Sequence, residues 1–227
     1  MKKRNVLLTF FDGIYLKNPV FSLFLGLTLA VICTTSFQSS LYIAGIVLVD
    51  MLVVELFIAI FRKHLGKLSS YVIAALLSAT ISVLATMLLE SWYAFIVIEG
   101  LSVWTNCIIA SFIPFIATTS AVLIKGEQAS ELDIPHAIAD ALGSGIGFGI
   151  ALGIIAFCRE WIGTASIQFT IDEESQYLLH SDAWTWTLPV ILNPFGGFLL
   201  TGFFSGIHAC ICHSITDRKQ KLVGGIE

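Results

Sequence analysis

Long apolar runs, separated by short polar stretches, dominate this chain. They cover approximately residues 20–36, 41–61, 71–90, 107–124, 141–158 and 188–212. A straight transmembrane helix needs about 20 apolar residues, so the pattern predicts six spans, of which the first and fourth are the shortest. The expected fold class is all-α: a polytopic membrane protein with one transmembrane domain over residues 1–227 and approximate halves at 1–90 and 91–227.

The composition supports a membrane protein and excludes several functional classes. Hydrophobic residues make up 56% of the chain and charged residues only 12%, whereas soluble domains carry about 25% charged residues. The sequence has no basic stripe or motif of the kind that binds nucleic acid. It also has no hydrolytic triad, phosphate loop or dinucleotide-binding fingerprint. Membrane lipid is therefore its first expected partner, and nucleic acid is not one.

The distribution of cationic residues predicts an orientation. With six spans, eleven of the twelve Lys and Arg residues fall on the side of the two termini, and only Arg159 falls on the other side. Cytoplasmic loops carry an excess of Lys and Arg. We therefore expect both termini in the cytoplasm and an external loop over residues 159–187.

Helix-breaking residues lie inside the first and fourth runs. Gly26 interrupts Leu25-Gly26-Leu27, and Pro114 interrupts the segment from Phe112 to Ile116. A broken helix is tolerated at membrane depth only where protein or a cavity covers the freed backbone. Paired broken segments in two halves of opposite orientation indicate an inverted repeat with a site near the midplane.

Further positions in the spans predict packing or polar chemistry. Gly145, Gly149 and Gly153, like Gly202 and Gly206, follow a four-residue spacing that allows close helix contacts, within the bundle or with a partner. Asp50 lies near the centre of the second run, where an acid is by default a functional candidate. It is expected in a cation or proton pathway, or else as a neutral acid that fixes a helix contact. Glu55 is expected to pair with Arg62 or Lys63.

The order of several motifs resembles one known family. The chain is similar to the integral membrane subunits of the Rnf and Na⁺-translocating NADH:quinone oxidoreductase (Nqr) complexes, closest to the RnfE/NqrD branch. The resemblance covers most of residues 18–212. It rests on Asn18-Pro19 before Leu25-Gly26-Leu27, Phe112-Ile113-Pro114-Phe115-Ile116, Lys125-Gly126-Glu127, Asp140, Arg159-Glu160-Trp161-Ile162-Gly163, and Leu188-Pro189 to Gly197.

The resemblance implies a cofactor, partners and a location. Each such subunit has six spans in inverted repeats, and two cysteines at its broken helices meet two from a sister subunit of opposite topology. The four cysteines hold a [2Fe–2S] cluster in the membrane, between flavin- and iron–sulfur-bearing subunits. The implied location is the cytoplasmic (inner) membrane of a bacterium or archaeon.

This chain departs from the family at both ligand positions, because Thr28 and Ser120 stand where the two cysteines are expected. Thiolates bind iron–sulfur clusters well, whereas alcohols keep their proton near neutral pH. The sequence therefore predicts a subunit without iron–sulfur ligands of its own.

Cys107 offers an alternative, because Thr105-Asn106-Cys107 reads like the second ligand motif of the family. The segment Phe112-Ile113-Pro114 follows it instead of preceding it. Cys107 also lies 33 residues before Asp140, whereas Ser120 lies 20 residues before it, which is closer to the family spacing. In this alternative Cys33 would be the partner of Cys107.

Three functions remain open from the sequence. The first is a scaffold and ion-path subunit of an Rnf- or Nqr-like complex that uses electron transfer to move ions. The second is a stand-alone secondary transporter or channel-like protein with inverted repeats. The third is a redox subunit that holds a cluster through Cys33 and Cys107.

Overall fold

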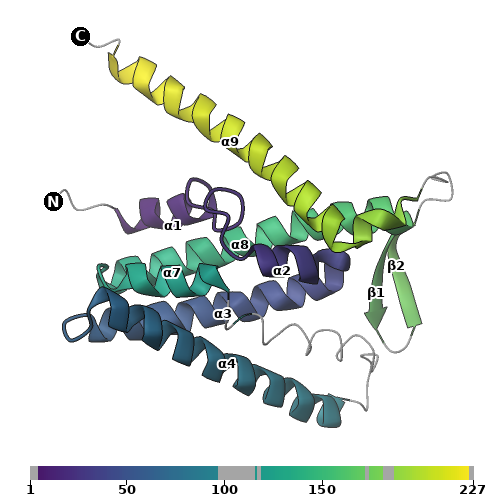
Figure 1. Ribbon diagram of the computed structural model, residues 1–227, viewed down its shortest axis with the longest axis horizontal. Coiled ribbons are helices and arrows are strands. Elements are labelled where there is room, and N and C mark those ends of the chain that lie inside the picture. The colour runs from purple at the N-terminus through teal and green to yellow at the C-terminus, as the bar shows by residue number, and fades with distance from the viewer. Residues whose placement is uncertain (1–4, 97–115, 117–118, 172–173, 181–186, 225–227) are drawn as a thin grey trace.

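The computed structural model describes residues 5–96, 116, 119–171, 174–180 and 187–224. This part of the chain is mostly helical (Figure 1). The α-helices are α1 (Val6–Ile14), α2 (Leu27–Ile32), α3 (Phe37–Phe61), α4 (Lys67–Ile96), α7 (Ser120–Ala129), α8 (Ile134–Thr164) and α9 (Pro194–Gly224). Two 3₁₀ turns, η1 (Cys33–Thr35) and η2 (Pro189–Leu192), continue or precede them.

Four described helices are long and apolar enough to cross a membrane: α3, α4, α8 and α9. The first and fourth runs of the sequence contain the short helices α2 and α7 instead, of 6 and 10 residues. Most of the fourth run, including Cys107 and Pro114, lies outside the described residues. The helical membrane fold is thus confirmed, while six spans and an inverted repeat remain predictions.

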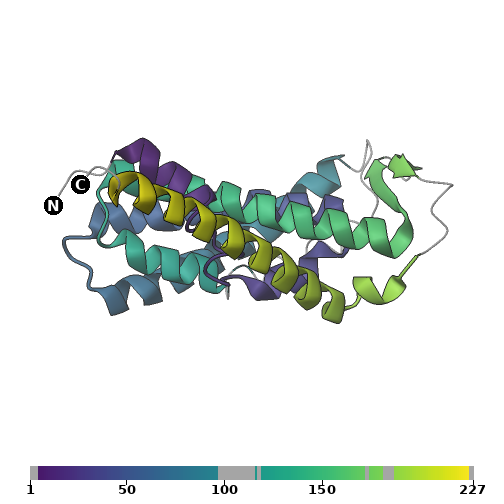
Figure 2. The same ribbon diagram turned by 90° about the horizontal axis from the view of Figure 1, so that it is seen from above.

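The bundle is built around α3 and α8, which lie side by side along much of their length (Figures 1 and 2). A Cβ atom on Gly145 would lie 3.1 Å from Leu48 Cα, and one on Gly149 would lie 3.2 Å from Ala44 Cβ. The glycine stripe of α8 therefore packs within the bundle. Gly202 and Gly206 have no described neighbour within 4 Å, and α9 leans away from the other helices (Figure 1).

A β-hairpin follows α8, an element that the all-α expectation did not include. Strands β1 (Ser166–Ile171) and β2 (Glu174–His180) pair antiparallel. Glu160 anchors the hairpin, because its carboxylate accepts hydrogen bonds from the backbone N–H of Gln168 at 2.8 Å and of Phe37 at 2.6 Å. One side chain thereby joins β1 to the first residue of α3.

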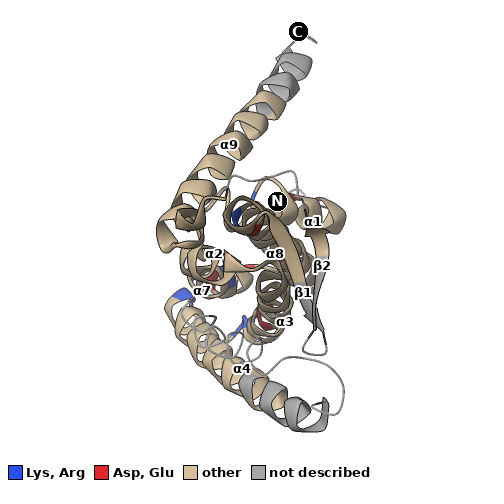
Figure 3. Ribbon diagram, turned by 90° about the vertical axis from the view of Figure 1, so that its right-hand side faces the viewer, with Lys and Arg blue, Asp and Glu red and all other residues tan. Residues whose placement is uncertain are grey.

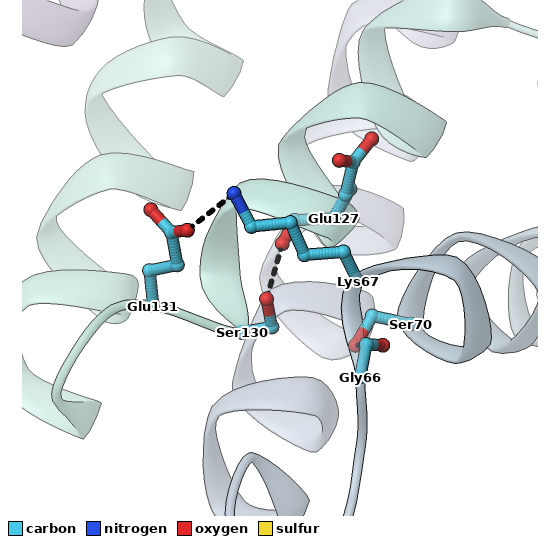
Figure 4. A network of polar contacts seen from close by, with 6 residues as sticks. All are labelled: Gly66, Lys67, Ser70, Glu127, Ser130 and Glu131. Atoms are coloured by element: carbon cyan, nitrogen blue, oxygen red, sulfur yellow. Dashed lines mark hydrogen bonds and ion pairs between the residues drawn. The ribbon is translucent and has the colours of Figure 1, made fainter.

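The connections between helices gather at the end of the bundle away from the hairpin. There α1 begins, α9 ends, and the α3–α4 and α7–α8 connections lie close together (Figure 1). Figure 4 shows an ion pair between these two connections, in which Lys67 Nζ lies 2.6 Å from Glu131 Oε1. Arg62 and Asp133 form a second ion pair, with Nη2 at 2.6 Å from Oδ1. Elsewhere the described ribbon carries few charged residues (Figure 3).

Arg159 lies inside the bundle instead of in an external loop. It is fully buried near the end of α8. Its guanidinium donates to the carbonyl oxygens of Val31, Ile191, Leu192 and Asn193 and to Thr34 Oγ1, at 2.6–3.1 Å. An arginine has five N–H donors, so all five are used. The carbonyls at the end of α2 and in η2, which have no partner within their own helices, are satisfied by one cation.

We predict that Arg159→Met strongly destabilises the protein. Leaving a buried carbonyl without a donor costs about 1–3 kcal/mol. Because Arg159 donates to four carbonyl oxygens, we expect its replacement to lower the unfolding free energy by more than about 3 kcal/mol. Thermal unfolding in detergent, followed by size-exclusion chromatography, measures the effect. Lys67→Met is the matched control, because its side chain is 67% exposed. Equal thermal unfolding midpoints for Arg159→Met and Lys67→Met would contradict this structural role of Arg159.

Candidate functional site

Two half-helices begin next to each other inside the bundle. Gly26 is the N-cap of α2 and has a left-handed backbone, with φ of 73°. Its N–H donates to Ser120 Oγ, the first residue of α7, at 3.1 Å. A Cβ atom on Gly26 would lie 2.5 Å from the Phe148 ring and 3.3 Å from Thr119. Glycine is therefore required at this break, both for its φ and for the close approach of α7 and α8.

Of the two positions where the resemblance predicts cluster ligands, the structure brings Ser120 to this contact and leaves Thr28 exposed. Ser120 is partly buried and accepts the Gly26 hydrogen bond. Thr28 lies in the first turn of α2 and is exposed. Within the described part of the chain, no hydrogen bond is found for the Thr28 hydroxyl. Two helix N-termini, each carrying a partial positive charge, thus start near one another beside an exposed hydroxyl.

The turn before α2 is held by Asn18. Its Oδ1 accepts from the N–H of Val20 at 3.0 Å and of Phe21 at 3.1 Å, while its Nδ2 donates to Gly147 O at 2.8 Å. The side chain satisfies backbone groups of the turn before the break and of α8. The Asn18-Pro19 motif therefore positions the entry to α2 against α8.

Cys33 lies deeper than the two substituted positions. It is fully buried in the apolar core, where η1 follows α2. Its thiol does not share the exposed surface of Thr28. Cys107, its partner in the alternative cluster site, lies outside the described residues.

Asp50 contacts α4 in the interior of the bundle. Ser78 Oγ donates to Asp50 Oδ2 at 2.6 Å, and the aspartate is fully buried. Its Oδ1 has no hydrogen-bond partner among the described residues. This arrangement joins α3 to α4, and it also leaves one carboxyl oxygen free to bind a cation or a proton.

An ion pair that the sequence pattern did not reveal lies between α7 and α8. Lys125 Nζ is 2.8 Å from Asp140 Oδ2, and the two side chains are 0% and 8% exposed. The six-span topology places Lys125 among the loop cations, which is wrong, because α7 continues to Ala129. The sequence does carry a signal for this pair, because Lys125 directly follows the fourth apolar run and Asp140 directly precedes the fifth.

Glu55 does not pair with Arg62 or Lys63 as the sequence suggested. Arg62 instead binds Asp133 and the carbonyl oxygen of Leu132. Glu55 is fully buried, and neither of its carboxyl oxygens has a hydrogen-bond partner among the described residues. It lies within electrostatic reach of Lys125 and Asp140. Glu55 on α3 therefore experiences the charges of the Lys125–Asp140 pair on α7 and α8.

A crevice of about 830 Å³ lies between the start of α1, the end of α3 and the start of α8. It is lined by Asn5, Val6, Ala59, Ile60, Arg62, Lys63, Asp133, Ile134, Pro135 and His136. Ala59 lies four residues after Glu55 on α3, and His136 lies four residues before Asp140 on α8. Four helical residues span about 6 Å, so each acid lies about one helical turn from a residue that lines the crevice.

We predict that Lys125→Met lowers the unfolding free energy by about 3–5 kcal/mol, because it leaves the Asp140 carboxylate buried without its partner. The double variant Lys125→Met/Asp140→Leu is expected to regain most of this loss, since an apolar pair can replace a buried ion pair. Chemical unfolding of both variants in detergent measures the difference. A double variant no more stable than the single one would contradict the pairing.

The comparisons with known proteins agree with the resemblance drawn from the order of motifs. A family model described as "Rnf-Nqr subunit, membrane protein" matches residues 6–205. A Na(+)-translocating NADH-quinone reductase subunit from Yersinia enterocolitica is 25% identical over 167 residues, which is 73% of each chain. The subunits of the same name from Yersinia pestis and Yersinia pseudotuberculosis are 24% identical over the same share. The chain belongs to the Rnf-Nqr family of membrane subunits.

Proposed function

We propose that this chain is a membrane subunit of an Rnf- or Nqr-like complex in which electron transfer drives ion translocation. Its own role is to act as scaffold and to form part of the ion path. The single observation that carries this role is the set of buried ionisable groups on α3, α7 and α8, in a chain whose family is one of membrane redox subunits. Ionisable groups at membrane depth mark ion or proton pathways.

The proposal includes the absence of iron–sulfur ligands from this chain. The two positions at the starts of α2 and α7 carry hydroxyls, Thr28 and Ser120, which are poor ligands for iron. The Ser120 hydroxyl is engaged in a hydrogen bond to Gly26, which suits a structural role. A family [2Fe–2S] cluster would then depend on the sister subunit or be absent, and electrons would cross by another route.

The partners follow from the family. The matching relatives are named as subunits of a Na(+)-translocating NADH-quinone reductase. We infer a sister membrane subunit of opposite topology and subunits that carry flavin and iron–sulfur centres. The proposed arrangement has six spans as two inverted repeats, in halves 1–90 and 91–227, with both termini on the cytoplasmic side of the inner membrane.

Asp50 is proposed as an ion-path residue. It lies five residues, or about 7.5 Å along the helix, deeper in α3 than Glu55. Its free oxygen, Oδ1, can accept a proton or coordinate a cation. Five residues rotate a helix by about 140°, so Asp50 faces Ser78 of α4 whereas Glu55 experiences the charges of α7 and α8.

We predict that the native assembly contains flavin- and iron–sulfur-bearing subunits, and that its iron content is unchanged when Cys33 and Cys107 are replaced by serine. Affinity purification from native membranes, iron quantification and electron paramagnetic resonance spectra test this. A chain that purifies alone favours the stand-alone transporter. Loss of two irons per complex on Cys107→Ser favours the redox subunit and contradicts the proposed function.

We also predict that Asp50→Asn reduces ion translocation per electron transferred at least tenfold, a change of about 1.4 kcal/mol in the barrier. Proteoliposome ion uptake, measured beside electron-transfer rate, provides the readout. Ser78→Ala is the matched variant, because it removes only the hydrogen bond to Asp50. Equal transport losses for both variants mean that Asp50 acts by fixing α4, and unchanged transport in Asp50→Asn removes it from the path.

A further inference from the structure

Glu55 occupies an environment in which a bare carboxylate is strongly disfavoured. Its side chain is fully buried between α3, α7 and α8, and no described residue donates a hydrogen bond to either oxygen. An unpaired charge in a low-dielectric interior costs several kcal/mol, so such a group either takes up a proton or binds a counter-ion. Among the described residues, the burial of Glu55 without a hydrogen-bond donor therefore favours its protonated form.

The charges that face Glu55 come from every helix packed against it. Lys125 on α7 and Asp140 on α8 are close enough to act on it electrostatically. They already neutralise each other through the 2.8 Å ion pair. On its own helix, Arg62 is paired with Asp133, and Asp50 is bound to Ser78 of α4. Among the described residues, Glu55 therefore has one nearby cation, Lys125, which it must share with Asp140.

The same neighbours distinguish a proton from a metal cation. A hard metal cation needs several oxygen ligands to replace its water. Within the described residues no group of three or more acidic, histidine or cysteine side chains is placed to hold a metal ion. A proton needs only one oxygen and no coordination shell.

Residues one helical turn from Glu55 and from Asp140 line the crevice. Ala59 follows Glu55 by four residues on α3, and His136 precedes Asp140 by four residues on α8, a rise of about 6 Å in each case. His136 Nδ1 also lies 3.3 Å from Thr9 Oγ1. This crevice is therefore where we expect a proton that leaves Glu55 to reach water.

We propose that Glu55 is a proton-binding site that selects H⁺ over Na⁺ and exchanges its proton with water in this crevice. In the loaded state the proton is bonded to a Glu55 oxygen, and Lys125 pairs with Asp140. On release that O–H bond breaks, its electron pair stays on Glu55, and the proton passes to a water molecule. Lys125 then stabilises two carboxylates. The inference rests on the proposed ion-path role only for its physiological consequence.

Infrared difference spectroscopy of the native assembly in lipid nanodiscs tests the site. In the wild type we expect a protonated-carboxyl C=O band that responds to pH and is unchanged when Na⁺ replaces K⁺ at constant pH. Glu55→Gln is expected to lose this band. Glu131→Gln is the matched control, because that side chain is 63% exposed and pairs with Lys67 at the protein surface.

Each outcome decides the proposal. A band that persists unchanged in Glu55→Gln overturns the site, and a wild-type band that Na⁺ abolishes at constant pH overturns the selectivity for protons. If Glu55→Gln does not accumulate in membranes, Glu55→Asp keeps a carboxyl on a shorter side chain and must shift the band. An unshifted band in Glu55→Asp also overturns the site. The measurement needs no ion pumping, so it can fail while the proposed function of the complex stands.

Discussion

The lipid interior offers no hydrogen-bond partners, and this constraint organises the whole bundle. Every polar group that lies at membrane depth must be satisfied by the protein itself. Arg159 shows the constraint most directly, because its five donors satisfy the ends of α2 and η2 together. Asn18 does the same for the turn before α2, and Glu160 for the start of α3. The breaks in the helices therefore lie where a side chain replaces the missing backbone bonds.

A few buried side-chain oxygens in the described part of the chain lack a hydrogen-bond partner. Native proteins leave few buried polar atoms without a partner. Among the described residues the carboxyl oxygens without one belong to Glu55 and Asp50, both on α3. Ser144 Oγ, one turn beyond Asp140 on α8, is a further example. Such groups lower stability unless something binds them, and this energetic cost is what connects the two acids to the proposed ion path.

The two half-helices meet through a hydroxyl at a position where the resemblance predicts a cluster ligand. A hydrogen bond from Gly26 N–H to Ser120 Oγ joins the starts of α2 and α7. A hydroxyl can donate and accept hydrogen bonds within the protein, whereas a cluster ligand must direct its sulfur toward the metal. The Ser120 hydroxyl therefore suits a junction that supports the fold, and Thr28 lies on the surface.

The sequence by itself determined the membrane class, the family and the helix break at Gly26, because hydropathy and glycine positions act locally. It also identified Asp50 and the glycine stripe of α8, since an acid or a small residue inside an apolar run is visible without a structure. Only the tertiary structure decided which charges meet. The Lys125–Asp140 pair joins residues on different helices, and Glu55 does not pair with the cations nearest to it in sequence. Arg159 turns inward to carbonyls at the end of α2 and at η2. Partner choice depends on how helices rotate and pack against one another, and a linear pattern of residue types does not encode that rotation in any single segment.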